Sequence, residues 1–347
     1  MEIIDLRSDT VSTPTPAMRE AMAKAEVGDD VFGEDPSVNR LQEVAAAKMG
    51  KQAGLFVPSG TMGNLIAVLT HCQRGDEVIM GDLGHTFLFE GGGISALGGV
   101  FPHTLPNQKD GTLSIEDIRK AFRPDDVHHP ISKLLVLENT HNRCGGVILP
   151  PGYTSDVGEL VHSRGLLLHI DGARIFNASV QSGIEAKSLV EAADSVTFCL
   201  SKGLCAPVGS VLCGSSEFIH KAVRIRKMLG GGMRQAGILA AAGLVALDQM
   251  VDRLSEDHKR AKRLAEGLAK IPGIQFEMGM PQTNMVFPSL SGEVSRTPVS
   301  IAKELSQLGI KIGVVAERQF RMVTQYWVND DGIERTIEAI GYILAQP

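Results

Sequence analysis

The stretch Ser195-Val-Thr-Phe-Cys-Leu-Ser-Lys202-Gly203 decides the fold that we expect, together with His169-Ile-Asp171-Gly-Ala-Arg174 before it. Each is a short apolar run that ends in polar residues and glycine, a pattern typical of a buried strand that stops at a functional site. Lys202 and Asp171 would stand at the ends of these two strands. The pattern therefore indicates neighbouring strands of one sheet, with two charged side chains at a common edge.

A lysine and an aspartate in this arrangement have a chemical use. Lysine forms a Schiff base with an aldehyde cofactor, and a carboxylate can hold a pyridine nitrogen protonated, which turns the ring into an electron sink. That combination is the chemistry of pyridoxal 5'-phosphate (PLP). Ser-Lys-Gly alone is a common tripeptide, and an isolated lysine is usually a solvated charge. The PLP interpretation therefore depends on the rest of the chain.

The chain before residue 250 alternates between short apolar runs and helical segments. Besides the two strands above, we expect strands at 54–57, 77–80, 133–137 and 210–214, and helices at about 16–25, 37–49, 65–71, 87–97, 114–122, 154–164, 187–193, 217–229 and 236–250. Such alternation is typical of an α/β fold in which helices sandwich a mostly parallel sheet. The polar strand ends would gather along one edge, where open sheets of this kind bind their ligands.

The character of the sequence changes after about residue 250. We expect a strongly charged helix over 251–270, short strands at 275–277, 284–288, 311–315 and 321–324, and helices at 299–308 and 332–344. This mixture predicts a smaller C-terminal α+β domain. We therefore expect an N-terminal arm plus a large cofactor-binding domain over residues 1–250, and a small domain over residues 251–347.

Three features could contact a cofactor. The small-residue turn Pro58–Asn64 opens a helix, where free N–H groups and the helix dipole suit a phosphate, although an ordinary helix cap has the same sequence. His85 follows a strand end and could stack on an aromatic ring or be an ordinary, partly buried histidine. Arg234 follows the flexible turn Gly230-Gly-Gly232 and could reach a phosphate or a neighbouring subunit.

Composition and charge exclude several classes of partner. The formal net charge of −6 argues against nucleic-acid binding, which needs a basic face. The longest apolar run, 236–247, is too short to span a bilayer. His128 and His129 have no cysteine or third histidine at ligand spacing nearby, so we expect no metal site.

The compartment is indicated by the cysteines and the first residues. The five cysteines form no C-x-x-C pair, which is typical of free thiols in a reducing compartment. The acidic start Met1–Asp5 lacks the basic and apolar regions of a secretory signal. We expect a soluble, cytoplasmic protein.

Eight ordered motifs resemble one family, the L-threonine aldolases, which are PLP enzymes of fold type I (the aspartate-aminotransferase-like fold). The motifs are Leu6-Arg-Ser-Asp-Thr10, Val27-Gly-Asp-Asp30, Gly33-Glu-Asp-Pro36, Pro58-Ser-Gly-Thr61, Glu138-Asn-Thr-His-Asn142, His169-Ile-Asp-Gly-Ala-Arg174, Leu200-Ser-Lys-Gly203 and Gly230-Gly-Gly-Met-Arg-Gln-Ala-Gly237. The resemblance extends from about residue 3 to about residue 325. It implies a PLP-dependent transferase-like fold and a homotetramer with shared active sites.

The resemblance also implies roles for single residues in binding the cofactor. Lys202 matches the Schiff-base lysine and Asp171 the partner of the pyridine nitrogen. The other matching positions are Gly60 and Thr61 for the phosphate turn, His85 for the ring-stacking histidine, Arg174 for a group that binds the substrate carboxylate or the cofactor's O3′, and Arg234 for the phosphate of a neighbouring subunit. The implied catalytic residues are Lys202, His85 and Asp171.

On the substrate side, the matching positions are Ser8, Arg174 and Arg321, near the substrate carboxylate or the cofactor, and His128, near the β-hydroxyl group. This chain departs from the family pattern at Gln325, where a histidine is usual, and at Ile131-Ser132, where Arg-Thr is common. Both departures are expected near the substrate side, so they leave the substrate range open.

The implied reaction is retro-aldol cleavage of L-threonine or L-allo-threonine to glycine and acetaldehyde, with His85 or a water that it holds as the base. Two alternatives remain open from the sequence. The fold hosts many chemistries, so β-elimination or transamination is possible. A PLP-binding homologue without activity would lack a catalytic group, and none is missing here.

Overall fold

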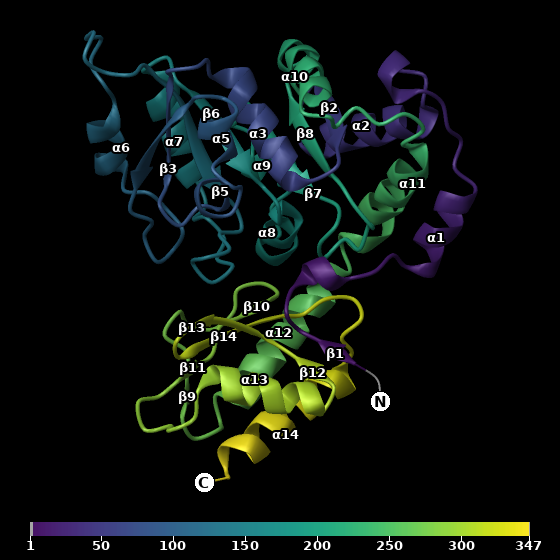
Figure 1. Ribbon diagram of the computed structural model, residues 1–347, viewed down its shortest axis with the longest axis vertical. Helices are drawn as coiled ribbons and strands as arrows, with labels where there is room; N and C mark the ends of the chain where they lie inside the picture. The colour runs from purple at the N-terminus through teal and green to yellow at the C-terminus, as the bar shows by residue number, and fades with distance from the viewer. Residues whose placement is uncertain (1–2, 347) are drawn as a thin grey trace.

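A seven-stranded sheet forms the centre of the larger part of the protein in the computed structural model, which describes residues 3–346 (Figure 1). In spatial order its strands are β2 (Ala53–Val57), β8 (Ser210–Gly214), β7 (Ser195–Cys199), β6 (Leu167–Asp171), β5 (Ser132–Glu138), β3 (Glu77–Gly81) and β4 (Phe101–Leu105). Strands β4, β3, β5, β6 and β7 pair in parallel, whereas β8 is antiparallel to both of its neighbours. The mostly parallel sheet is therefore confirmed.

Helices cover both faces of this sheet. The helices of this part are α1 (Pro16–Ala23), α2 (Pro36–Lys48), α3 (Gly60–His71), α4 (His85–Leu88), α5 (Gly93–Ala96), α6 (Ile115–Ala121), α7 (Tyr153–His162), α8 (Ile175–Ser182), α9 (Ala186–Leu189), α10 (Ser216–Met228) and α11 (Gly237–Val245). Alternate strand residues point to opposite faces, so Ile170 packs in the core with α2, α7 and α8, while Val136 and Leu212 pack against α3 and α10. This alternation produces the predicted arrangement, in which the sheet lies between two layers of helices.

Three local predictions were wrong for identifiable reasons. The helix expected from residue 65 begins at Gly60, because the Ser59 hydroxyl caps it by accepting the N–H of Met62 at 3.2 Å. The single helix expected over 87–97 is two short helices, because Gly91 and Gly92 between them have φ values of 63° and 66°. Strand β4 was missed because it contains Pro102, which is tolerated there at the edge of the sheet.

The smaller part contains a second sheet and a core of its own (Figure 1, lower half). Its strands are β10 (Met285–Val286), β14 (Gln319–Val323), β11 (Ser289–Leu290) and β9 (Ile274–Gln275), with β13 (Gly313–Ala316) also paired to β14. The helices α12 (Leu254–Leu268), α13 (Pro298–Gln307) and α14 (Asp330–Leu344) pack with them, and a π-helical turn at Ala246–Met250 precedes α12. No helix among residues 3–346 is long and apolar enough to cross a membrane.

The N-terminal arm crosses to this smaller part. Strand β1 (Ile4–Asp5) pairs in parallel with β12 (Ile310–Lys311), and the N–H of Ile4 donates to the carbonyl of Gly309 at 2.9 Å. Ile4 and Leu6 are buried in the core formed by the C-terminal residues. The arm then turns back, so residues 8–12 lie beside Lys202, whose carbonyl accepts a hydrogen bond from the Ser12 hydroxyl at 2.8 Å.

Candidate active site

Lys202 lines a pocket of about 400 Å³ beyond the end of β7. The pocket is bounded by Ser8, Thr10, His85, Phe89, Asn142, Arg143, Arg174, Lys202, Phe287, Val315 and Arg321. These residues come from the N-terminal arm, from the strand ends of the large sheet and from the smaller part. Five of the predicted site residues, Ser8, His85, Arg174, Lys202 and Arg321, therefore meet in one pocket.

Asp171 lies at the end of β6 next to this pocket, and its side chain is buried. One carboxylate oxygen accepts the N–H of Ala173 at 3.1 Å, and the other accepts a hydrogen from the Asn64 amide at 2.8 Å. Asp171 and His85 also line a small cavity together. The two residues that we expect to contact an aromatic ring are thus neighbours.

His85 is held by a buried carboxylate. Its ring nitrogen Nδ1 lies 2.9 Å from Oε1 of Glu90, and its backbone N–H donates to Oε2 of Glu138 at 2.7 Å. The hydrogen bond to Glu90 raises the pKa of His85, against the effect of burial. Burial in turn raises the pKa of the Glu90 carboxyl, although its hydrogen bond from His85 counteracts this. A proton therefore lies between Nδ1 of His85 and Oε1 of Glu90.

The predicted phosphate turn lies at the N-terminus of α3. A Cβ atom on Gly60 would lie 2.9 Å from Sγ of Cys199, and one on Gly63 would lie 2.6 Å from Cγ2 of Thr197. Glycine at both positions is therefore what allows the start of this helix to pack closely on β7. The first N–H groups of a helix lack intrahelical partners and carry the positive end of its dipole, which suits an anion.

Three arginines, Arg143, Arg174 and Arg321, also line the pocket. Arg174 is buried and donates to both carboxylate oxygens of Asp9, at 2.7 and 2.5 Å. Burial alone would raise the pKa of Asp9, but the charge and hydrogen bonds of Arg174 hold it well below its usual value. The neighbouring Arg321 donates to Oδ1 of Asn142 at 3.1 Å, and burial lowers its pKa to about 10.

Two guanidinium atoms in this region are left without partners. Within residues 3–346, the Nε atoms of Arg143 and Arg321 are buried and make no hydrogen bond. Unpaired buried donors are costly, so an anionic ligand such as a carboxylate would be stabilised here. The arrangement fits a small anionic molecule held between Lys202 and the arginines.

Besides Gly60, Thr61 and Asp171, two further predicted residues do not line this pocket, and both are exposed. His128 is on an exposed loop with Nδ1 2.6 Å from Oδ1 of Asp126, and the exposed Arg234 donates to Oδ2 of Asp29 at 3.0 Å. Neither lines the pocket of its own chain. Both are accessible to a neighbouring chain.

The residues that depart from the family pattern do not line the Lys202 pocket either. Gln325 is buried, where its amide oxygen accepts the N–H of Trp327 at 2.9 Å. Ile131 and Ser132 line a different pocket, and the Ser132 hydroxyl donates to Glu77 at 2.8 Å. The expectation that these positions border the substrate therefore finds no support in the pocket of a single chain.

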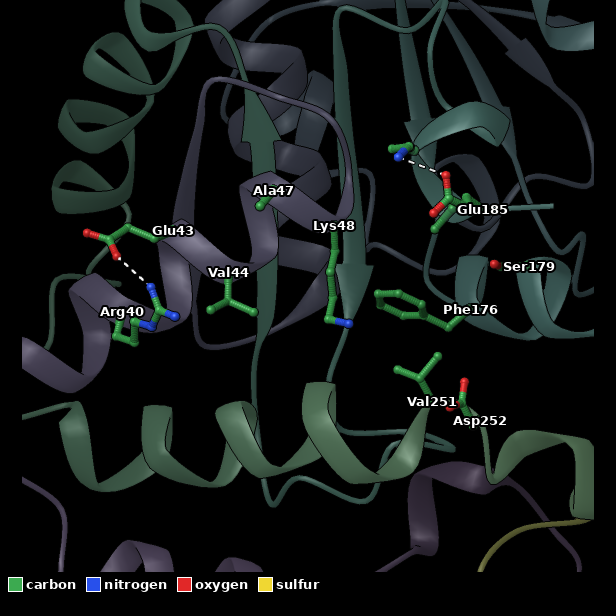
Figure 2. Close-up of a pocket in the computed structure, with 12 residues that line it drawn as sticks. Arg40, Glu43, Val44, Ala47, Lys48, Phe176, Ser179, Glu185, Val251 and Asp252 are labelled. Carbon is green, nitrogen blue, oxygen red and sulfur yellow. Dashed lines mark hydrogen bonds and ion pairs between the residues drawn. The ribbon is translucent and has the colours of Figure 1, made fainter. Parts of the chain in front are cut away.

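A larger groove, of about 750 Å³, lies elsewhere, between α2, α8 and Val251 (Figure 2). Arg40 and Glu43 pair with each other at its rim, and Lys48 lies beside Phe176. None of the predicted site residues lines it. The smaller Lys202 pocket is therefore the better candidate, because its charged groups converge.

Sequence reasoning missed Asp9, Asn64 and Glu90. Asp9 lies directly after Ser8 within a motif that was noted, and Asn64 lies four residues after Gly60, which places both on one face of α3. That spacing could have predicted Asn64 if the start of the helix had been placed correctly. The helical spacing does not predict the contact of Glu90 with His85, because α4 ends at Leu88 and Glu90 lies beyond it, five residues after His85.

Comparisons with known proteins agree with this geometry. A model of the beta-eliminating lyase family matches residues 5–291. The chain is 51% identical to a probable low-specificity L-threonine aldolase 2 of Arabidopsis thaliana over 95% of this chain and 94% of that one. It is 50% identical to a low specificity L-threonine aldolase of Escherichia coli K12, over 84% and 86% of the two chains.

A solved structure of a Leishmania major threonine aldolase has the same fold. It superposes with a TM-score of 0.85 at 22% sequence identity, and the match covers 99% of this chain and 100% of that chain. At this identity the likeness establishes the fold alone. The expected fold type I architecture is therefore confirmed.

Proposed function

This chain belongs to the beta-eliminating lyase family, and we propose from that membership that it is a low-specificity L-threonine aldolase that uses PLP. The reaction is the reversible cleavage of L-threonine or L-allo-threonine, and of related β-hydroxy-α-amino acids, to glycine and an aldehyde. The observation that carries the proposal is the convergence of Lys202, Asp171 and His85 with an arginine cluster. About 50% identity to named threonine aldolases supports the same activity.

The residues present fit PLP by their chemistry. Lys202 supplies an amine that can hold the aldehyde carbon covalently, and the buried Asp171 carboxylate suits a protonated pyridine nitrogen. Gly60 and Thr61 begin α3, where glycine is required for the close approach to β7 and N–H groups are free to bind a phosphate. We propose that Arg174 contacts the O3′ oxygen. When bound, PLP would supply an electron sink for the cleavage of the Cα–Cβ bond.

The other side chains would bind and orient the amino acid. Arg321, with Arg174 and Ser8, would hold the α-carboxylate, because a guanidinium binds a carboxylate through two hydrogen bonds. His85 would accept the β-hydroxyl proton, directly or through a water, at Nε2, since Nδ1 is occupied by Glu90. The apolar Phe89, Phe287 and Val315 would contact the substrate side chain and limit access of water.

Two further site residues would come from a neighbouring chain. His128 and Arg234 are exposed here, and the turn Gly230–Gly232 gives Arg234 the freedom to extend. We propose that Arg234 binds the PLP phosphate of another subunit, that His128 lies near the β-hydroxyl group, and that the protein is a homotetramer with shared active sites.

The broader assignments are proposals as well. The protein would act in the cytoplasm in glycine biosynthesis and threonine catabolism, without nucleic-acid or membrane partners. The chain would divide into residues 1–250, the arm plus the PLP-binding domain, and residues 251–347, the small domain. Two separate hydrophobic cores support this division, and Ile4 and Leu6 of the arm contribute to the smaller core.

The decisive experiment is to incubate the PLP-loaded protein with L-threonine, L-allo-threonine and phenylserine. Glycine and the matching aldehyde should accumulate in equal amounts. Ammonia together with a keto acid would instead establish β-elimination, and the aldolase proposal would be rejected. The ratio of rates for the two threonine diastereomers measures the stereochemical preference.

A further inference from the structure

A buried polar network lies behind the Lys202 pocket, with Asn64 at its centre. The Asn64 side chain is 2% exposed. Its amide nitrogen Nδ2 lies 2.8 Å from Oε1 of Glu90 and 2.8 Å from Oδ2 of Asp171. Its oxygen Oδ1 lies 3.2 Å from Nε2 of His169. One carboxamide therefore contacts two buried carboxylates of the site and a buried histidine.

The hydrogens of this network have one consistent arrangement. Asn64 has two amide hydrogens and donates one to each carboxylate, so Oδ1 must accept the hydrogen on Nε2 of His169. Nδ1 of His169 then accepts the Ser195 hydroxyl at 2.8 Å, and Ser195 Oγ accepts the hydrogen on Nε2 of His71 at 2.7 Å. A flipped Asn64 amide would turn its oxygen towards the two carboxylates. The two carboxylates thus fix which way the amide points, and the amide in turn fixes the tautomers of the histidines.

Both histidines of this network remain neutral. Burial lowers the pKa of His169 to about 3 and that of His71 to about 4. Neutral imidazoles with fixed tautomers give Asn64 a constant support across the pH range in which the enzyme would work. The amide is therefore rigidly oriented rather than free to follow its carboxylate neighbours.

Glu90 depends on Asn64 for its own position. Its oxygen Oε1 accepts hydrogens from Asn64 and from Nδ1 of His85, whereas Oε2 is buried and has no hydrogen-bond partner in the part of the chain that the structure describes. The contacts at Oε1 thus hold the carboxylate in place. Because this oxygen accepts the proton on Nδ1, the other ring nitrogen of His85 is left free as a base.

The side chains of His85, Glu90 and Asp171 are grouped as the ligands of a metal ion would be. One ligand atom each of His85, Glu90 and Asp171 lies within 4.8 Å of the others. However, Asn64 directs its two amide hydrogens at the oxygens of Glu90 and Asp171. A cation bound to those oxygens would meet the hydrogens of the amide, so hydrogen bonding accounts for the cluster.

We propose that Asn64 is a positioning residue whose single carboxamide orients both Asp171, at the ring nitrogen of the cofactor, and Glu90, which orients His85 at the substrate. This inference rests on the proposed PLP-dependent function. Asn64 does not line the Lys202 pocket, so it acts through the two carboxylates and not on the substrate itself.

The first test replaces Asn64 by serine in the full-length, PLP-loaded protein. Without the amide, Asp171 loses a charge-assisted hydrogen bond and Glu90 loses its anchor, so kcat should fall about 10- to 100-fold. KM for L-allo-threonine should change little, because no substrate contact is removed. The visible absorption band of bound PLP should also change its pH dependence, because the support of the ring-nitrogen partner has changed.

The second test separates the effect of Asn64 on Glu90 and His85 from its effect on Asp171. Glu90→Gln removes the anion beside His85 but leaves Asn64 and Asp171 in place. The acid limb of the kcat/KM profile should move to lower pH, because the pKa of the base is no longer raised, while the pH dependence of the absorption band should stay as in the wild type. The matched control is Asn329→Ser, which substitutes one helix-capping residue for another at α14 and should change neither readout.

The outcomes are distinguishable from failure of the proposed function. A wild-type protein that neither forms an absorbing PLP complex nor releases glycine would reject that function. Given an active wild type, an Asn64→Ser enzyme with unchanged kcat and absorption would overturn the positioning role. If Asn64→Ser does not fold, Glu90→Gln decides, and an unmoved acid limb would overturn the proposal.

Discussion

Asp9 and Arg174 form a buried ion pair between residues that lie 165 positions apart, with donor–acceptor distances of 2.7 and 2.5 Å. The two parallel hydrogen bonds fix the plane of the guanidinium group. The same carboxylate accepts a hydrogen from Asn284 at 3.3 Å. One aspartate therefore joins the N-terminal arm, the end of β6 and the smaller part around the proposed carboxylate site.

Replacement of Asp9 by alanine should be costly, because it leaves the Arg174 charge buried without its partner. We expect a loss of about 3–5 kcal/mol in the free energy of unfolding, together with a higher KM for the amino acid. Urea denaturation and steady-state kinetics measure the two effects. The exposed Asp156, changed to asparagine, is the control, and a stable, fully active Asp9→Ala enzyme would contradict the assigned role.

Lys202→Ala should abolish turnover, because no other amine in the pocket lining can hold the cofactor aldehyde. Borohydride reduction of the wild type should attach PLP covalently to Lys202, and the variant should show no such attachment. Mass spectrometry of peptides identifies the modified lysine. Lys48→Ala, at a lysine in the surface groove, should behave as the wild type. Labelling of a different lysine in the wild type would show that Lys202 is not the attachment site.

Asp171→Asn should retain the fold, since asparagine has nearly the same shape and can still accept the Ala173 N–H. Its neutral side chain cannot stabilise a protonated pyridine nitrogen as well, so we expect kcat to fall about 10- to 100-fold. Circular dichroism and kcat provide the comparison. Near-native turnover would remove Asp171 from the mechanism.

Arg234→Ala should weaken PLP binding if Arg234 reaches the phosphate in a neighbouring subunit. Mixing this variant with Lys202→Ala chains should restore part of the activity, because each defect then falls in a different site of the hybrid. Subunit exchange is verified by native mass spectrometry. Verified exchange without recovery of activity, or full activity in a stable monomer, would exclude shared sites.

Stability should decrease as the pH falls from about 6.5 towards 4. Burial lowers the pKa values of His71, His169 and His258 to about 4, 3 and 4, so the unfolded chain binds protons in this window and the folded chain does not. Each histidine then contributes a loss of up to about 1.4 kcal/mol per pH unit. Urea unfolding at pH 7, 6 and 5 measures the slope. His71→Gln should reduce it, and His220→Gln, at an exposed position, should not.

The central sheet could be predicted because each buried strand is a self-contained signal. Apolar runs such as 195–199 end in polar residues. Both the strands and the edge of the sheet that carries the site can therefore be recognised in the sequence. The same local logic placed Lys202 and Asp171 at neighbouring strand ends, and β6 and β7 do pair. Strand β4 was not predicted, because Pro102 argues against a strand unless its edge position is known.

The contacts between distant segments could not be predicted from local patterns. Asp9 meets Arg174, and Asn64 meets Asp171 and Glu90, only after the chain has folded. An asparagine within an apolar helix looks the same in the sequence whether its side chain orients residues of a site or only completes the hydrogen bonds of a neighbouring group. The exposed positions of His128 and Arg234 are a further example, because their proposed partners belong to another chain.

The pairing of β1 with β12 has a consequence for how the protein folds during translation. Ile4 meets Ile310 in that pair, so β1 has no partner until the chain has been translated beyond residue 310. Ile4 of this strand and Leu6 directly after it stay uncovered while the large sheet assembles on the ribosome. We therefore expect the segment around Ile4 and Leu6 to be the one that chaperones bind longest, and the smaller core to form last.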